Sequence, residues 1–323
     1  MVNQLLVLVN SAGGAAASAG DALSDMLVSA FTATGVTADV RILAAGAMGA
    51  AIASAVEKRR RIVVAGGDGT AACAAQAIIG SDAELALLPL GTLNHLARDL
   101  GIPADLNAAA EVAAHGAATR IDVGEVNGRR FVNNVSIGIY PSMIRERDAH
   151  RQSRGWPKWL ATIPAAWQAI SGLRRHRLRI DMGQGEQPLI TPLLLVGNNG
   201  YLLDAGKLGS RASLQDGMLS VYAVSSRSRL SLIWFAVRAL LGRVDREADF
   251  VALGTCEALT VRASRPSVEI AIDGELCRMA CPLIFRMHAG ALRIATPRDP
   301  SVSEEAACSW SGLYDREITA RNF

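Results

Sequence analysis

The sequence predicts a three-layer α/β domain with a parallel sheet, followed by a mostly antiparallel β-sandwich domain. In the first third of the chain, short apolar runs alternate with helix-like segments, which is the pattern of β-α-β units. Beyond residue 120, strand-like runs dominate and helical segments are few. Half of the 323 residues are hydrophobic and 20% are charged, so the chain has enough apolar material for the cores of two ordinary domains.

The first domain is expected to contain strands that are each followed by a helix. Buried strands are expected over residues 5–9, 38–43, 62–65 and 85–89, and helices over residues 21–34, 47–60, 70–79, 93–99 and 107–115. Because each strand precedes a helix, the carboxyl ends of these strands share one edge of the predicted sheet. Open α/β sheets bind their ligands at that edge.

Asn127-Gly128 marks the change to the second domain, because this pair favours a tight two-residue hairpin turn. We expect the turn to join strands at 121–126 and 131–135. Further strands are expected at residues 178–181, 193–197, 219–223, 258–262, 268–272 and 283–288, with helices at 159–171 and 230–241. The expected domains are 1–121 and 122–289. Residues 290–323 either pack back on the first domain or, from Asp299 onward, form a polar tail.

Composition and charge argue against several protein classes. The net charge of +3 is too small to indicate nucleic-acid binding by itself. Five cysteines without paired spacing predict free thiols in a reducing compartment rather than a disulfide framework. A run of about 18 uncharged apolar residues is absent, so no membrane-spanning helix is expected. The apolar run at residues 5–9 is too short for a signal peptide.

The most specific motif is Gly66-Gly67-Asp68-Gly69-Thr70, which lies between an expected strand and an expected helix. Its glycines allow the backbone to approach a ligand closely, and the unpaired N–H groups at a helix start attract a phosphate. Thr70 can donate a hydrogen bond to a phosphate oxygen, and Asp68 can bind Mg²⁺ directly or through water. The alternative is a glycine-rich turn in which Asp68 only caps the helix.

A second turn, Gly91-Thr92-Leu93-Asn94, follows the strand expected at 85–89 and therefore lies at the same edge of the sheet. Gly91 permits close approach of a ligand, while Thr92 and Asn94 offer hydrogen-bonding groups. The alternative is an ordinary turn with Thr92 as the helix cap. Two such turns at one edge favour a phosphate-binding site.

Together with these turns, a series of ordered blocks resembles the diacylglycerol kinase catalytic domain family, in its bacterial lipid kinase branch. The blocks lie at residues 9–14, 66–70, 89–103, 133–138, 197–198, 216–219 and 273–275. The resemblance implies a two-domain fold like that of NAD kinase, with ATP between the domains. The nucleotide-binding residues that it implies are Asn10, Gly66, Gly67, Asp68, Gly69, Thr70, Thr92 and Asn94.

The chain departs from the family pattern at three places. The first loop, Asn10-Ser11-Ala12-Gly13-Gly14, lacks the proline that the family usually has there. Leu43, Ala44 and Ala45 follow the second expected strand, where a threonine is common. His95 stands where many members have an aspartate. One nucleotide contact and the role of that aspartate are therefore in question for this chain.

The resemblance places the general base for phosphoryl transfer in Asp273-Gly274-Glu275, with Glu275 slightly preferred over Asp273. Transfer to an alcohol needs a carboxylate that orients or deprotonates the hydroxyl. Without the resemblance, the same triplet is better interpreted as an Asp-Gly hairpin turn that is followed by an exposed glutamate.

The segment from Ser213 to Met218 is similar to a loop that holds a structural Mg²⁺ in some bacterial members. Asp216 would give its carboxylate, and Ser213 and Met218 would give their backbone carbonyls. A set of oxygen ligands of this kind suits Mg²⁺. The alternative is a surface turn.

The implied activity is transfer of the γ-phosphoryl group of ATP, with Mg²⁺, to the hydroxyl of a lipid such as diacylglycerol. We therefore expect a lipid substrate at the membrane surface, peripheral membrane contact and a cytoplasmic location at the inner face of the cell membrane. Candidate membrane contacts are the basic amphipathic helix at 230–241 and the tryptophans Trp156, Trp159 and Trp167; each could instead pack on the β domain. Two other functions stay open, a kinase of a soluble acceptor such as NAD and a regulator that binds nucleotide or lipid without turnover.

Overall fold

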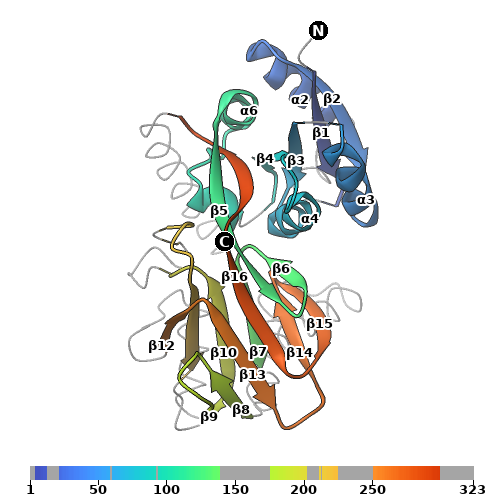
Figure 1. Cartoon of the computed structure of the whole chain (residues 1–323). Coiled ribbons are helices and arrows are strands. Elements are labelled where there is room, and N and C mark those ends of the chain that lie inside the picture. The colour runs from blue at the N-terminus through green and yellow to red at the C-terminus, as the bar shows by residue number, and fades with distance from the viewer. Residues whose placement is uncertain are drawn as a thin grey trace, which may run out of the picture. The chain divides into compact units, whose positions relative to one another are not determined.

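The computed structural model describes residues 4–12, 22–58, 60–91, 94–138, 175–201, 211, 213–224 and 250–298 (Figure 1). The chain divides into two compact units, which are considered separately. The first unit takes the described residues within Met1–Val123, Gly209–Gln215 and Ala289–Phe323, and the second takes those within Gly124–Leu208 and Asp216–His288. Within the described ranges, none of the helices has the length and apolar character needed to cross a membrane.

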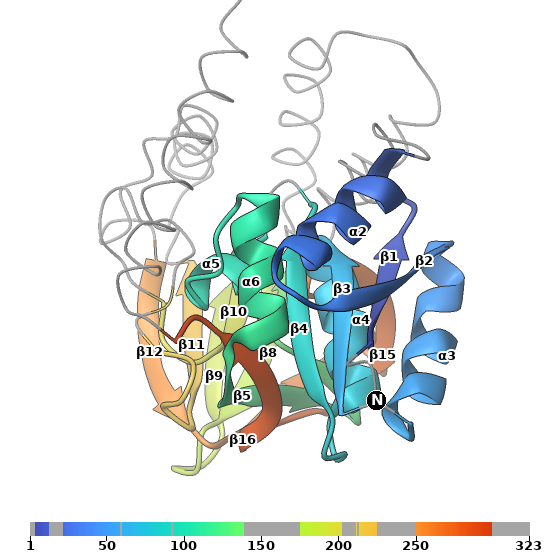
Figure 2. The same cartoon turned by 90° about the horizontal axis from the view of Figure 1, so that it is seen from above.

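The first unit is built on a parallel sheet with the strand order β2-β1-β3-β4. These strands are β1 (Gln4–Asn10), β2 (Thr37–Leu43), β3 (Arg61–Gly66) and β4 (Glu84–Pro89), and the helices are α2 (Ala22–Ala33), α3 (Ala45–Val56), α4 (Asp68–Ile78), α5 (His95–Asp99) and α6 (Leu106–His115). Helix α3 packs against α4, and α2 against α6, so helices cover the sheet on both faces (Figure 2). Val7, Val63 and Leu85 are consequently fully buried. The expected α/β fold is confirmed.

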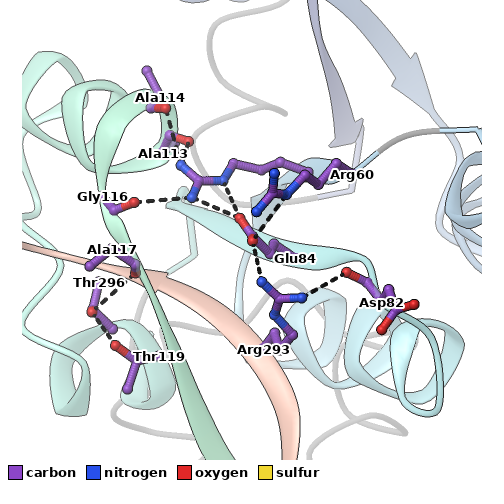
Figure 3. Close-up of polar contacts among 11 residues, drawn as sticks. Arg60, Asp82, Glu84, Ala113, Ala114, Gly116, Ala117, Thr119, Arg293 and Thr296 are labelled. Carbon is purple, nitrogen blue, oxygen red and sulfur yellow. Dashed lines mark hydrogen bonds and ion pairs between the residues drawn. The ribbon is translucent and has the colours of Figure 1, made fainter.

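Glu84, at the start of β4, connects several elements of the first unit (Figure 3). Its buried carboxylate accepts charge-assisted hydrogen bonds from Arg61 of β3 at 2.8 Å and from Arg293 at 2.7 Å, while the Arg60 guanidinium lies 3.6 Å away. Arg61 also donates to three backbone carbonyls at the carboxyl end of α6, at 3.0–3.1 Å. A guanidinium at this position satisfies the free carbonyls of the helix end and complements its dipole.

The second unit contains two sheets that share one apolar core. One sheet has the order β12-β11-β10-β7-β14-β15, and the other contains β13, β8, β9, the first half of β16 and the β5–β6 hairpin. Side chains of both sheets, including Phe131, Val196, Ile270 and Phe285, belong to the same buried cluster. The strands are β5 (Ala117–Val126), β6 (Arg129–Phe131), β7 (Asn134–Gly138), β8 (His176–Asp181), β9 (Gln187–Thr191), β10 (Leu193–Asn198), β11 (Leu219–Val224), β12 (Phe250–Cys256), β13 (Ala258–Ala263), β14 (Ser267–Ile272), β15 (Glu275–Ala280) and β16 (Leu283–Thr296). This arrangement confirms the expected antiparallel β-sandwich.

The Asn127-Gly128 turn forms as expected, but its second strand was placed wrongly. Asn127 and Gly128 both have positive φ, 45° and 84°, as a two-residue primed turn requires. The strand that pairs with β5 is β6, which ends at Phe131, whereas β7 belongs to the other sheet. The ladder stops there because the N–H groups of the next three residues donate to the Asp273 carboxylate. Strands β9, β12 and β15 were not expected from the sequence.

Strand β16 is longer than the strand expected at 283–288. Residues 283–286 pair antiparallel with β13 in the second unit. Further along the same strand, Ile294 pairs in parallel with Leu85 of β4 in the first unit. One strand therefore contributes to the sheets of both units.

Candidate functional site

The two glycine-containing turns of the first unit pack directly against each other. A Cβ atom at Gly91 would collide with the Cα of Gly67, and one at Gly66 would collide with the side chain of Thr70. The Leu90 N–H also donates to the Gly66 carbonyl at 3.1 Å. Glycine is therefore required at Gly91 by the close approach of a second backbone and at Gly66 by the Thr70 side chain, before any ligand binds. This places the carboxyl ends of β3 and β4 in contact, as the sequence predicts.

Asn94 shapes the second turn with its side chain. Its Oδ1 accepts a hydrogen bond from the Gly91 N–H at 3.0 Å, and its Nδ2 donates to the Gly91 carbonyl at 2.6 Å. The residue is buried and has a φ of 47°, a left-handed conformation that asparagine tolerates. Both polar atoms of the amide thus bind the turn, and its expected contact with the nucleotide stays a prediction.

Asn10 and Thr70, both expected to bind nucleotide, bind each other. The Asn10 Nδ2 donates to the Thr70 Oγ1 at 2.9 Å, and the Asn10 Oδ1 accepts from the Ala12 N–H at 3.0 Å. This pair connects the end of β1 to the first turn of α4. The hydroxyl of Thr70, which accepts from Asn10, keeps its own proton for another acceptor.

Asp68 is the first residue of α4, and its Oδ1 accepts a hydrogen bond from the Leu96 N–H at 3.2 Å. The residue before it, Gly67, is the N-cap and has no side chain with which to cap the helix. Gly67, Asp68 and Thr70 line a pocket together with Asn94 of the second turn and Leu96 of α5. A helix start without a side-chain cap, beside glycine turns, is suited to a phosphate group.

His95, the first residue of α5, is mostly buried, and its Nδ1 has no hydrogen-bond partner among the described residues. Burial lowers the pKa of its imidazole, and the positive charges of Arg98 and Arg211 lower it further, while Asp68 and Asp99 oppose this shift. The ring is therefore uncharged at neutral pH. An uncharged imidazole thus occupies the position where the family pattern often has a carboxylate.

The last residue of α5, Asp99, forms a buried ion pair with Arg211. The Arg211 Nε donates to the Asp99 Oδ2 at 2.7 Å, and the two side chains are 0% and 2% exposed, respectively. Burial raises the pKa of the Asp99 carboxyl, an effect that the neighbouring guanidinium opposes. Neither residue was singled out in the sequence, because an ion pair between positions 112 residues apart has no local signature.

In the second unit, Asp273 holds a turn together. Its carboxylate accepts three backbone hydrogen bonds, from Val132 at 2.9 Å, Asn133 at 2.8 Å and Asn134 at 3.0 Å. With Gly274, it forms the two-residue loop between β14 and β15, and both residues have positive φ. A carboxylate with three N–H donors is poorly placed to accept a proton from a substrate.

Glu275, by contrast, begins β15 with a side chain that is 67% exposed and lies 3.9 Å from the Arg129 guanidinium. The same guanidinium hydrogen-bonds the Cys277 thiol and opposes the rise that burial causes in its pKa. The hairpin and the exposed glutamate are consistent with two interpretations of the triplet: an ordinary Asp-Gly turn that is followed by an exposed glutamate, and the family pattern. Of the two candidate bases, Glu275 is the accessible one. Arg129 was missed in the sequence, although it directly follows the Asn-Gly turn.

The loop expected to hold Mg²⁺ offers oxygen donors. The Asp216 side chain is exposed and precedes Gly217, whose φ is 70°. The Met218 carbonyl accepts from the Asn199 N–H at 3.0 Å, and a carbonyl oxygen has a second lone pair. Oxygen donors of these kinds fit Mg²⁺ chemically. Ser213 belongs to the first unit, whereas Asp216 and Met218 belong to the second.

Some expected site residues are not among those that the structure describes. Thr92, the helix expected at 230–241 and the tryptophans Trp156, Trp159 and Trp167 lie outside the described ranges. Gly69 is described and exposed in the first turn of α4. Within the described ranges, no cluster of three His, Cys, Asp or Glu side chains could hold a metal ion.

Comparison with known proteins adds three findings. Residues 4–126 match the family model of the diacylglycerol kinase catalytic domain. A diacylglycerol kinase of Mycobacterium tuberculosis is 30% identical over 258 residues, which cover 76% of this chain and 80% of that protein. A diacylglycerol kinase of Bacillus subtilis is 30% identical over 188 residues, or 56% and 60% of the two chains. The crystal structure of a diacylglycerol kinase from Bacillus anthracis superposes with a TM-score of 0.67 at 20% identity, covering 93% of this chain and 98% of that one.

Proposed function

Because the chain belongs to the diacylglycerol kinase catalytic domain family, we propose that it transfers the γ-phosphoryl group of ATP to a lipid hydroxyl. Diacylglycerol is the first candidate acceptor, because the relatives with the highest similarity reported above are named diacylglycerol kinases. We also propose that the lipid is reached by peripheral contact with a membrane surface.

The observation that carries this proposal is the pair of turns that meet at the carboxyl edge of the parallel sheet. Gly67 and Gly91 bring two backbones together, and the start of α4 lacks a side-chain cap. The phosphates of ATP would accept hydrogen bonds from N–H groups of this helix start and from the Thr70 hydroxyl. Phosphoryl transfer depends mainly on positioning and on charge stabilisation, which a rigid pair of turns supports.

Glu275 is the proposed general base. It would accept the proton of the lipid hydroxyl as that oxygen attacks the γ-phosphorus, while ADP leaves. Its exposure supports this role over Asp273, whose carboxylate accepts three backbone hydrogen bonds. The Arg129 guanidinium lies 3.9 Å from the Glu275 carboxylate.

Mg²⁺ is proposed as the metal, with Asp68 as one candidate ligand and the Ser213–Met218 loop as a structural site. When bound, the ion would neutralise charge on the phosphates and on the loop carboxylate. Asp68 has one carboxylate oxygen engaged by Leu96, and a carboxylate offers further lone pairs for a metal or its water.

The test is transfer of label from γ-labelled ATP, with Mg²⁺, to vesicles that contain diacylglycerol. The native chain is expected to label the lipid, and Asp68→Ala and Glu275→Gln are expected to abolish most of the label. Label on NAD or another soluble alcohol, and none on any lipid, would contradict the lipid acceptor. ATP binding without transfer to any acceptor would indicate a regulator instead.

A matched pair of vesicle preparations separates the acceptor from the membrane contact. One preparation contains diacylglycerol in a neutral phospholipid, and the other contains it with an anionic phospholipid. If the protein works at a membrane surface, it is expected to float with vesicles, and more so with the anionic ones because the chain is basic. Labelling of detergent-dispersed diacylglycerol without flotation would contradict the membrane contact while leaving the reaction intact.

A further inference from the structure

Helix α5 connects two parts of the first unit through contacts at its two ends. Near its start, the Leu96 N–H donates to the Asp68 carboxylate at 3.2 Å. Asp68 lies in the turn formed by residues 66–70, which we call the phosphate turn. At its end, Asp99 binds Arg211 through a bond of 2.7 Å. The helix has only five residues, so a shift at one end moves the other.

The ion pair is buried in a way that favours a positioning role. The exposed fraction is 0% for the Arg211 side chain and 2% for the Asp99 side chain. A fully buried pair gains little net stability over apolar side chains of similar size, because desolvation offsets the attraction. However, neither partner can move away alone without leaving an unpaired charge in a dry environment. The position of Arg211 is thereby fixed to that of α5.

Arg211 leads into residues 213–215, which are anchored in the same unit; we refer to Arg211 and residues 213–215 as the Arg211 segment. The Leu214 carbonyl accepts from the Asp122 N–H at 2.8 Å, and the Gln215 side chain donates to the Arg120 carbonyl at 2.7 Å. These two bonds attach the segment to β5. The ion pair joins it to α5, and through α5 to Asp68.

We infer that Asp99 and Arg211 are positioning residues that couple the phosphate turn at Asp68 to the Arg211 segment. Binding of phosphate groups at the turn reduces the mobility of Asp68 and of the start of α5. Because Asp99 is paired with Arg211, the mobility of the Arg211 segment is reduced as well. Ser213, a candidate Mg²⁺ ligand, lies in that segment, so nucleotide binding would order one part of the metal loop. The inference rests on the proposed function, since it assumes that the turn binds the phosphates of ATP.

The test is hydrogen–deuterium exchange of the full chain with ATP in the presence of EDTA, so that no divalent metal contributes. In the native protein, ATP is expected to slow exchange both in the phosphate turn around Asp68 and in the Arg211 segment. For the segment we expect at least about fivefold, the lower end of common coupling strengths. The decisive variant carries Asp99→Leu and Arg211→Met together, which removes both charges at once. It should keep protection of the turn and lose that of the segment.

Arg98→Met is the matched control, because it removes an arginine from the same helix while leaving the Asp99–Arg211 pair in place. It is expected to behave as the native chain does. A cooperative thermal transition is required of each variant. If the double variant does not fold, Arg211→Lys replaces it. This change keeps the positive charge but loses the short Nε contact. We expect it to reduce the protection of the segment roughly twofold or more.

The outcomes separate the two proposals. Absence of protection at the phosphate turn in the native chain, both in EDTA and with Mg²⁺ in its place, would contradict the proposed nucleotide site. Protection of the turn but not of the segment would overturn the coupling alone. Protection of the segment that persists in the double variant would overturn the role of the ion pair.

Discussion

The Asn10 Nδ2 donates a 2.9 Å hydrogen bond to the Thr70 Oγ1, so the end of β1 is tied to the first turn of α4. Replacing Asn10 with alanine removes this bond and leaves the Thr70 hydroxyl without its orientation. We expect the dissociation constant for ATP to rise about tenfold, as the loss of one hydrogen bond implies. Titration calorimetry measures this, with Thr70→Ser as the control that keeps a hydroxyl. Unchanged affinity in Asn10→Ala would contradict an orienting role.

Substitution of Glu275 should affect mainly kcat, whereas substitution of Asp273 should affect mainly the free energy of unfolding. Glu275→Gln removes the proposed base from an exposed position, so kcat should fall by about 10²–10⁴-fold with little change in the free energy of unfolding. Asp273→Asn weakens three backbone hydrogen bonds and should lower that free energy by about 1–3 kcal/mol. Steady-state kinetics and urea unfolding test both. A larger loss of kcat in folded Asp273→Asn than in Glu275→Gln would reverse the assignment.

The two neighbouring arginines Arg60 and Arg61 should differ in their contribution to stability. Arg61 is mostly buried against Glu84 and the end of α6, whereas the Arg60 side chain is 83% exposed. Arg61→Ala should lower the free energy of unfolding by about 1–3 kcal/mol, because it leaves the carbonyls at the end of α6 without their donor while Arg293 still pairs with Glu84. Arg60→Ala should cost at most about 1 kcal/mol. Equal effects in urea unfolding would show that Arg61 does not organise this end of the unit.

His95 makes stability depend on pH. Its folded-state pKa is lowered from the ordinary value of 6.5, chiefly by burial, so the unfolded chain binds the proton first as the pH falls. The contribution of the uncharged His95 ring to the free energy of unfolding is therefore fully present above about pH 6.5 and is lost progressively as the pH falls below that value. In EDTA, His95→Gln is expected to flatten the pH dependence of the melting temperature in this window. A slope equal to that of the native chain would contradict the assignment.

The Cys256 thiol should resist alkylation in the folded protein. Burial raises its pKa to about 11, and only the thiolate reacts. With iodoacetamide at about pH 8, close to the ordinary thiol pKa, peptide mapping should show little modification of Cys256. Cys281, which is less buried, serves as the internal reference. Rapid modification of both under native conditions would show that this part of the β-sandwich opens readily.

Local patterns in the sequence account for the fold class and for one half of the candidate site. Glycine turns that follow β-branched strands place Gly66 and Gly91 at one sheet edge, and the structure brings these turns into contact. The prediction holds because strand–turn–helix chemistry depends on adjacent residues. The Asn-Gly turn was predicted for the same reason.

Roles that depend on distant partners could not be predicted. The three hydrogen bonds to the Asp273 carboxylate come from backbone N–H groups about 140 positions earlier in the chain. From the sequence, Glu275 was therefore only slightly preferred over Asp273 as the candidate base. The buried ion pair between Asp99 and Arg211 likewise joins positions 112 residues apart. The second strand of the hairpin was misplaced because the ladder is broken by a carboxylate that no local pattern reveals.

Strand β16 has a consequence for the order in which the chain can fold during its synthesis. Leu85 of β4 pairs with Ile294, which is made more than 200 residues later. Until then, the nascent parallel sheet exposes the free edge of β4, with unpaired backbone groups that can bind other extended chains. The first unit therefore completes its sheet only after the whole second unit has been made. Expression of residues 1–123 alone would therefore yield a sheet with an open, aggregation-prone edge.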